Sequence, residues 1–216
     1  FHTEVRAEDV YCEGIERLSS EDFRYAQELG YAIKLLAIGH WDDSGLQLRV
    51  HPALVPLAHL LAKVDGVFNA IEVEGDLVGR VVFHGQGAGA LPTSSAVVAD
   101  VVGVARGIAT SGVLATSHRL DRGLRIKSMG DLNTKFYLRL HILDKPRVLA
   151  QIAEVLGDLN VSIASVIQKE TGDHNGTADL VITTHLALES SVQKALERIA
   201  HLPVVRAVKN FIRVED

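Results

Sequence analysis

Three glycines at alternate positions, Gly85, Gly87 and Gly89, form the part of this chain that is best suited to close contact with a ligand. Glycine has no side chain and takes positive φ readily, so a ligand can approach the backbone. Pro92 and Thr93 follow, and both residue types are typical of a helix start. The first N–H groups of a helix have no acceptor within it. The pattern therefore predicts a glycine loop whose N–H groups can meet a ligand oxygen.

The glycine spacing by itself does not identify that ligand. Dinucleotide-binding folds use G-x-G-x-x-G between a strand and a helix, with an acidic residue about 20 positions later. Here the spacing is G-x-G-x-G, and the loop follows a predicted hairpin. A tight turn without a ligand is the alternative interpretation.

The elements around this loop are predicted by their hydrophobic patterns. Ser19 and Asp22 resemble a capping box, which predicts a helix over residues 20–29. Alternation predicts one hairpin from residues 31–41 and 46–51, and a second from residues 67–73 and 77–84.

Gly75 lies in the predicted turn of the second hairpin, where we expect an unusual backbone conformation. The two hairpins supply four antiparallel strands. We expect these strands to form the back half of one mixed sheet.

Several blocks of this region closely resemble the homoserine dehydrogenase family. The clearest are FNAIEVEGDLVG, Phe68 to Gly79, and GQGAGALPTSSAV, Gly85 to Val97. The resemblance extends back through Val10 to Gly39 and Leu48 to Pro56. It implies an oxidoreductase that interconverts L-homoserine and L-aspartate 4-semialdehyde with NADP or NAD, in threonine, methionine and isoleucine biosynthesis.

The resemblance also implies where functional residues lie. In that family the Rossmann domain, the substrate-binding carboxylates and the catalytic lysine precede the position that corresponds to Phe1. We therefore expect a fragment that binds the cofactor through Gly89 and Gly87, while the absent N-terminal domain holds most of it. No catalytic residue is assigned, and the chain alone is expected to be inactive. The implied assembly is a homodimer or higher homo-oligomer.

A second pattern begins near Lys135. Strand, helix, two strands, helix and strand follow in order, which is the ferredoxin-like βαββαβ plan. The stretch LRLHILDKPRVLAQIAEVLGDLNVSI within it resembles the ACT domain, an amino-acid-sensing module. The resemblance implies a small amino-acid effector, with threonine as the expected one. The candidate effector-binding residues are Asp144, Arg147, Val148, Asn160 and Gln168.

Arg147 departs from the ACT pattern, which usually reads D-x-P-G-V-L. The usual glycine lets an effector approach the backbone. Arg147 can instead supply a guanidinium fork for a carboxylate, or it can be a solvated side chain on a module kept for assembly.

Composition excludes several classes of protein. The 216 residues are 47% hydrophobic and 23% charged, as in an ordinary globular protein. The net charge of -5 argues against nucleic-acid binding. We see no apolar run near the roughly 18 residues that cross a membrane, and no metal-binding cluster. The single cysteine, Cys12, is expected to be buried and suits a cytoplasmic protein.

These observations predict an α+β protein with three parts. Residues 1–118 form the C-terminal part of a catalytic and dimerisation domain with a partial mixed or antiparallel sheet. Residues 119–134 form a polar linker, and residues 135–216 form the ACT domain. The alternative is a non-catalytic amino-acid-sensing or assembly protein.

Overall fold

The computed structural model describes residues 3–109, 124–170 and 176–215. They form two compact units, which are described separately here. The first holds residues 5–57, called the N-terminal segment below, together with the chain from residue 124 onward, called the C-terminal region. The second holds residues 3–4 and the described residues from Ala58 up to residue 109.

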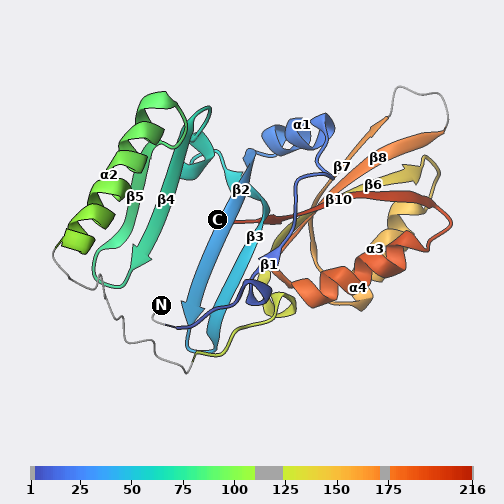
Figure 1. Cartoon of the computed structure of the whole chain (residues 1–216). Coiled ribbons are helices and arrows are strands. Elements are labelled where there is room, and N and C mark those ends of the chain that lie inside the picture. Colours follow the sequence, from blue (N-terminus) through green and yellow to red (C-terminus); the bar gives the residue numbers. More distant parts are fainter. Residues whose placement is uncertain (1–2, 110–123, 171–175, 216) are drawn as a thin grey trace. The chain divides into compact units, whose positions relative to one another are not determined.

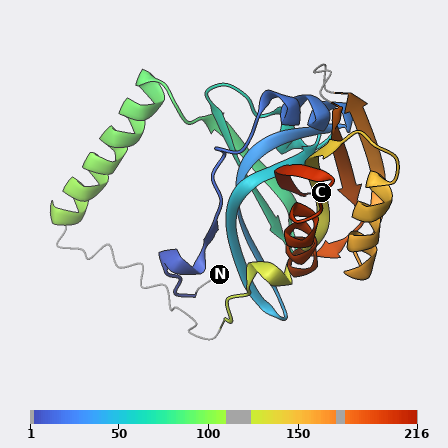
Figure 2. The ribbon, with the colours of Figure 1, turned by 90° about the vertical axis from the view of Figure 1, so that its right-hand side faces the viewer.

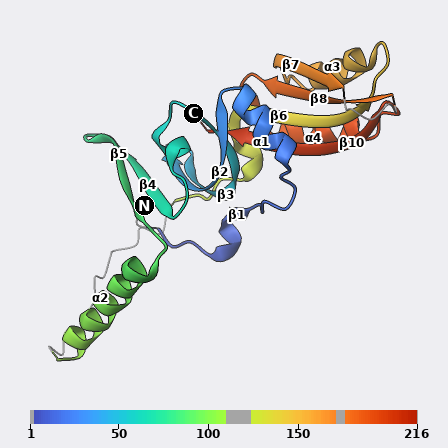
Figure 3. The same cartoon turned by 90° about the horizontal axis from the view of Figure 1, so that it is seen from above.

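The first unit is built on one mixed sheet. Its strands follow the order β1-β3-β10-β6-β8-β7, with β2 paired to β3 and β9 paired to β6 (Figures 1 and 3). The bounds are β1 Tyr11–Cys12, β2 Tyr31–Asp42, β3 Gly45–Pro56, β6 Asn133–Leu143, β7 Ile163–Glu170, β8 Thr177–Thr184, β9 Ala187–Leu188 and β10 Val205–Val214.

Strand β3 joins the two sequence segments of this unit. One edge of β3 pairs with β2 along its whole length, from Tyr31 opposite Pro56 to Asp42 opposite Gly45. A strand has only two edges, so β1 and β10 share the other one. Both run parallel to β3, and β10 pairs with it through two residues, Arg213 and Val214. The sheet of the C-terminal region therefore continues into the N-terminal segment.

Helices cover both faces of the sheet. Helices α3 (Val148–Asp158) and α4 (Glu189–Ala200) lie on the same face, as Figures 1 and 2 show. Together with β6, β7, β8 and β10 they confirm the predicted βαββαβ order. Their core contains the following buried side chains: Leu138, Leu140, Ile142, Ile152, Leu156, Leu180, Val192 and Ile199.

Helix α1 (Ser20–Glu28) packs on the opposite face of the sheet. Its start confirms the predicted capping box, because the Ser19 N–H donates to the Asp22 carboxylate at 3.0 Å. Tyr25 and Ala26 are buried in a cluster that also holds Leu54, Tyr137, Val181, Ile212 and Val214. The apolar contacts of α1 thus connect the N-terminal segment to the C-terminal region.

The second unit contains one hairpin and one long helix. The hairpin pairs β4 (Phe68–Gly75) with β5 (Gly79–Gln86), and helix α2 spans Ala90–Ala109. A 3-10 turn, Leu60–Lys63, precedes the hairpin. The prediction that both hairpins share one sheet is wrong for the described residues, because β4 and β5 pair only with each other.

The turn of this hairpin also differs from the prediction. Gly75 pairs with Gly79 at the end of the ladder, so the turn lies two residues later than expected. Positive φ occurs at Gly79, at 68°, and not at Gly75. The sequence pattern locates the hairpin correctly but not the residue that reverses the chain.

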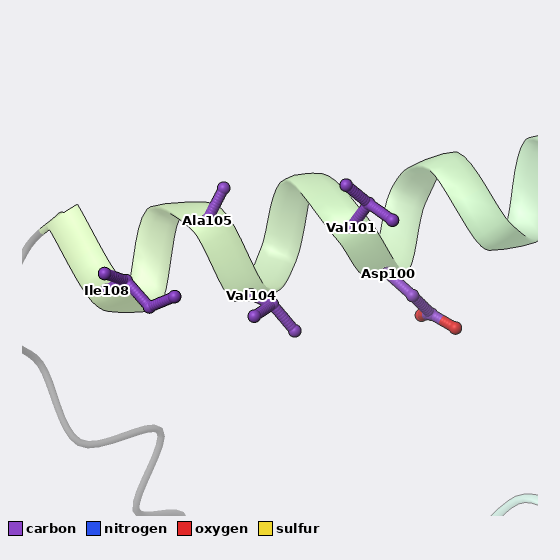
Figure 4. Close-up of a pocket in the computed structure, with 5 residues that line it drawn as sticks. All are labelled: Asp100, Val101, Val104, Ala105 and Ile108. Atoms are coloured by element: carbon purple, nitrogen blue, oxygen red, sulfur yellow. The ribbon is translucent and has the colours of Figure 1, made fainter.

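Helix α2 is apolar and exposed along its length. Val101 is 62% exposed, Val104 57% and Ile108 77%. Figure 4 shows these side chains on the helix with Asp100 and Ala105, and the five residues line an open, mostly apolar pocket. Contrary to expectation, α2 is long and apolar enough to cross a membrane by length and composition, a test that core helices of other proteins also pass.

The described part of the predicted linker lies beside β3. The Leu46 N–H donates to the Arg125 carbonyl, and the Lys127 N–H donates to the Leu46 carbonyl, both at 2.8 Å. The Lys127 ammonium also pairs with Asp42 at 2.8 Å. Residues 119–123 of the predicted linker lie outside the described residues. Residues 124–132 are thus held by backbone hydrogen bonds, while the predicted domain boundaries remain predictions.

Cys12 is exposed, which corrects the expectation that it is buried. It lies in β1, a strand of two residues that pairs only with β3 among the described strands. A small apolar side chain is typical of a buried position, which is why the sequence predicts burial. Strand β1 is too short, and too close to the edge of the sheet, for other residues to cover the Cys12 side chain.

His51 in β3 is a buried residue whose ionisation is disfavoured. Its side chain is fully buried, and burial lowers the pKa of the imidazole from 6.5 to about 4, against the opposing effect of the Pro52 carbonyl. Its Nδ1 atom lies 3.0 Å from that carbonyl oxygen, so the neutral ring donates from Nδ1. Nε2 is buried without a hydrogen-bond partner and lies 3.7 Å from Glu215.

We expect His51 to reduce stability in weak acid. An unfolded histidine binds its proton near pH 6.5 and the folded one near pH 4, so the unfolded state takes up protons first. Stability present above pH 6.5 is then lost as pH falls toward 4, by about 2 to 3 kcal/mol. Urea unfolding between pH 4 and 8 should show a smaller decline for His51→Gln than for the unmodified chain.

The control for that measurement is His40→Gln. The His40 side chain is 62% exposed, so its substitution should leave the pH profile unchanged. Parallel profiles for His51→Gln and the unmodified chain would contradict the assignment of a buried neutral imidazole.

Candidate functional site

The glycine loop joins β5 to α2 in the second unit. Gly89 has φ of 128°, and its carbonyl accepts the Thr93 N–H at 3.1 Å, which starts the helix. The N–H groups of Ala90 and Leu91 precede that bond and have no acceptor within the helix. Helix α2 starts at Ala90, so Pro92 lies in its first turn, as predicted for a helix-start residue.

Two of the three glycines have open space where a side chain would stand. A Cβ atom on Gly85 would meet no atom within 4 Å, and one on Gly89 would only touch the Pro92 ring at 3.4 Å. Gly87 is different, because a Cβ there would clash with the Asn69 side-chain amide. The Gly87 N–H donates to the Val67 carbonyl at 3.0 Å. Gly87 therefore packs against β4, and Gly89 supplies the unusual backbone conformation.

Aromatic and polar side chains lie on the hairpin next to the loop. The rings of Phe68 and His84 stack at 4.9 Å with an interplanar angle of 14°. Farther along, Arg80 lies 3.3 Å from Glu72, and His59 lies 3.6 Å from Glu72. One Glu72 oxygen is buried without a hydrogen bond. The hairpin thus presents an aromatic pair beside the loop and a charged cluster away from it.

The first unit holds the candidate effector residues. The Gln168 side chain in β7 donates to the Asp144 carboxylate at 2.9 Å, and both side chains are exposed. The Asp144 N–H donates to the Gly176 carbonyl. Val148 is buried as the first residue of α3. The structure therefore brings Asp144, Arg147, Val148 and Gln168 together at the start of α3.

Arg147 precedes α3 with φ of 73°, a left-handed conformation that favours glycine. Its carbonyl accepts the Gln151 N–H at 3.3 Å, and the residue is exposed. The backbone here has the shape that a glycine would take without strain.

Asn160 does not join this group. It follows α3 at the far end, with φ of 58°, and its N–H donates to the Gly157 carbonyl. Eleven helical residues, Val148 to Asp158, separate the two ends by about 16 Å. Asn160 therefore closes the C-terminus of α3 in the manner of a left-handed cap.

Sequence reasoning missed the polar residues buried between the two segments of the first unit. The Asp22 carboxylate is fully buried and pairs with Arg139 at 2.7 Å. Burial opposes the charge on Arg139, but Asp22 nevertheless raises the pKa of that guanidinium. Burial, together with the nearby Asp22 charge, raises the pKa of Tyr137. The sequence carries no signal of this burial, because Arg139 alternates with the core residues Leu138 and Leu140 and so takes the position of a solvent-facing side chain.

A second buried arginine, Arg213, lies on the other face of the sheet. It pairs with Glu189 at 2.6 Å and with Glu13 at 2.7 Å. Although burial opposes the charged form, the hydrogen bond and charge of Glu189 raise the pKa of Arg213.

No cluster of three or more metal-ligating side chains occurs among the described residues.

Comparisons with known proteins agree along the whole chain. The homoserine dehydrogenase family model matches residues 1–102, and the ACT domain model matches residues 136–203. The homoserine dehydrogenase of Neisseria gonorrhoeae is 41% identical over 221 residues, which cover 100% of this chain and 51% of the relative. That of Corynebacterium glutamicum is 41% identical over 220 residues, with coverage of 100% and 48%. The chain spans about half the length of these curated relatives.

Solved structures give the same result. A homoserine dehydrogenase from Thiobacillus denitrificans superposes with a TM-score of 0.85 at 41% identity, covering 100% of this chain and 50% of that one. The S. aureus enzyme at pH 7.0 superposes with a TM-score of 0.61 at 27% identity, with coverage of 98% and 49%. The fold described above therefore matches about half of the chain in each of these solved structures.

Proposed function

The chain belongs to the homoserine dehydrogenase family, matched through residues 1–102, and carries an ACT domain within residues 136–203; from this premise we propose that the whole protein interconverts L-homoserine and L-aspartate 4-semialdehyde. The observation that carries the proposal is the 41% identity along the entire chain to homoserine dehydrogenases. The pathway is that of threonine, methionine and isoleucine, and the compartment is the cytoplasm.

The proposed cofactor is NADP or NAD, which takes up or delivers the hydride. In this chain the glycine loop fits such a ligand, because Gly85 and Gly89 leave the backbone uncovered. Gly89 would position the cofactor because it has no Cβ, which lets the cofactor approach its backbone, and because the N–H groups at the start of α2 lie beside it. Gly87 would act indirectly, by holding the loop against Asn69. Proton transfer is assigned to no residue of this chain.

The proposed assembly is a homodimer or a larger homo-oligomer. The hairpin has one apolar face with Ile71 66%, Val73 49% and Phe83 62% exposed. Helix α2 exposes a second apolar surface. Apolar area of this extent is normally covered by protein. The family match reaches into α2, as far as residue 102, which favours protein rather than lipid as its cover.

Steady-state assays test the proposed activity. The whole protein should oxidise homoserine with NADP or NAD. The 216 residues alone should show no turnover above background, because the family resemblance implies that the catalytic lysine lies outside them. Dehydrogenase activity of the 216-residue chain would contradict the division of roles, and an inactive whole protein would contradict the function itself.

Substitution of Gly89 tests the cofactor loop. In the whole protein, Gly89→Val should raise the cofactor KM at least tenfold, about 1.4 kcal/mol, because the side chain fills the approach to the backbone. Gly79→Val is the matched control, since Gly79 also has positive φ but lies in the far turn of the hairpin. An equal KM for both variants would make the loop a structural turn only.

Threonine is the proposed effector, and calorimetric titration tests it. The full 216-residue chain should be used, because Arg139 and Arg213 have partners in the N-terminal segment. We expect weak threonine binding that raises Tm by mass action, and reduced binding by Arg147→Ala but not by Arg125→Ala. Isoleucine and methionine serve as ligand controls. A flat titration at millimolar threonine would leave assembly as the role of the domain.

A further inference from the structure

The buried carboxylate of Asp22 connects α1 to the ACT sheet, on the face opposite the Arg213–Glu13 pair. Asp22 Oδ1 accepts hydrogen bonds from Arg139 Nε at 2.7 Å and from the Tyr137 hydroxyl at 3.1 Å. Asp22 Oδ2 accepts from Arg139 Nη2 at 3.1 Å and from the Asn210 amide at 2.9 Å. Both oxygens of this α1 residue are therefore held by side chains from β6 and β10.

The backbone joins β3 to the C-terminal region at its two ends. Two residue pairs connect β3 with β10, Arg213 with Ala53 and Val214 with Leu54, and Leu46 makes two hydrogen bonds to the chain before β6. None of these backbone contacts involves α1. Removing one partner of a buried ion pair leaves an uncompensated buried charge, which costs roughly what several ladder hydrogen bonds contribute. The Asp22–Arg139 pair is thus a major determinant of how firmly α1 is attached to the sheet.

The pair also continues toward the candidate effector residues. Arg139 Nη1 lies 3.4 Å from Asp179 in β8. The neighbour of Asp179 along β8, Leu180, pairs in register with Gln168 of β7, whose side chain holds Asp144. A short series of strand contacts therefore runs from the start of α3 to α1.

We propose that the Asp22–Arg139 pair makes α1, the β2–β3 hairpin and the ACT sheet one cooperative unit, so that the ACT domain acts on the N-terminal segment through a buried ion pair and not through a tether. Asp22 and Arg139 are positioning residues in this device. Its use in feedback rests on the proposed function, whereas the cooperative unit itself does not.

Hydrogen exchange of the 216-residue chain tests the coupling without any ligand. Leu140 is fully buried on the α3–α4 face of the sheet, away from α1, so Leu140→Ala destabilises the ACT core directly. We expect this substitution to lower amide protection in β6, in β8 and in α1 by similar factors of tenfold or more. The β4–β5 hairpin of the second unit should keep its protection and serves as the internal control.

The decisive comparison repeats Leu140→Ala in an Asp22→Asn background. Protection in β6 and β8 should again fall tenfold or more, while α1 should now respond by less than threefold. Asp42→Asn is the matched control, because its carboxylate pairs with Lys127 near the surface, and there the response of α1 should stay coupled. Arg139→Lys replaces Asp22→Asn if that variant does not fold, since it keeps the charge and loses the planar fork.

Two results would overturn the proposal. One is an α1 that does not respond to Leu140→Ala in the unmodified background, and the other is an α1 that responds equally with and without Asp22. Failure of threonine to bind would instead remove only the proposed effector, because exchange measures the coupling independently. In the whole protein, Asp22→Asn should bind threonine as before and lose at least two thirds of its threonine inhibition.

Discussion

A carboxylate that leaves water must receive hydrogen-bond donors from the fold, and the buried Asp22 receives them from strands far along the chain. Tyr137 and Arg139 lie 115 and 117 residues away in sequence. A single unsatisfied charge in that place would cost several kcal/mol. These donors hold α1 against the sheet, where Tyr25 and Ala26 lie in one buried cluster with Leu54 of β3 and Ile212 of β10.

The local pattern of the fold could be read from the sequence because it is set by neighbours along the chain. The capping box at Ser19, the long β2–β3 hairpin and the βαββαβ order follow from spacing of caps and apolar residues. The errors lie where distant contacts decide. Cys12 is exposed because β1 is short and at an edge. The two hairpins belong to different sheets, and the sequence could not predict this because strand pairing between distant segments leaves no periodic signal.

The candidate site was predictable to the same extent. The positive φ of Gly89 follows from glycine spacing ahead of a helix, but the contact between Gly87 and Asn69 depends on how two strands are paired. Asp144 and Gln168 meet because the start of α3 lies next to β7. Asn160 follows Asp144 by only 16 positions in the sequence, yet α3 lies between them and places Asn160 at the opposite end of that helix.

Arg147 shows how a module can keep its shape while its chemistry changes. The residue takes φ of 73°, so the backbone turn that a glycine would form survives the substitution at a cost of about 1 to 2 kcal/mol. That cost is tolerable in a region with a large buried core. The pairs Arg139–Asp22 and Arg213–Glu13 lie outside this turn, and neither involves Arg147. The ACT domain therefore completes the sheet of the N-terminal segment whatever ligand its turn accepts, and changes at the turn can alter sensing without loss of the fold.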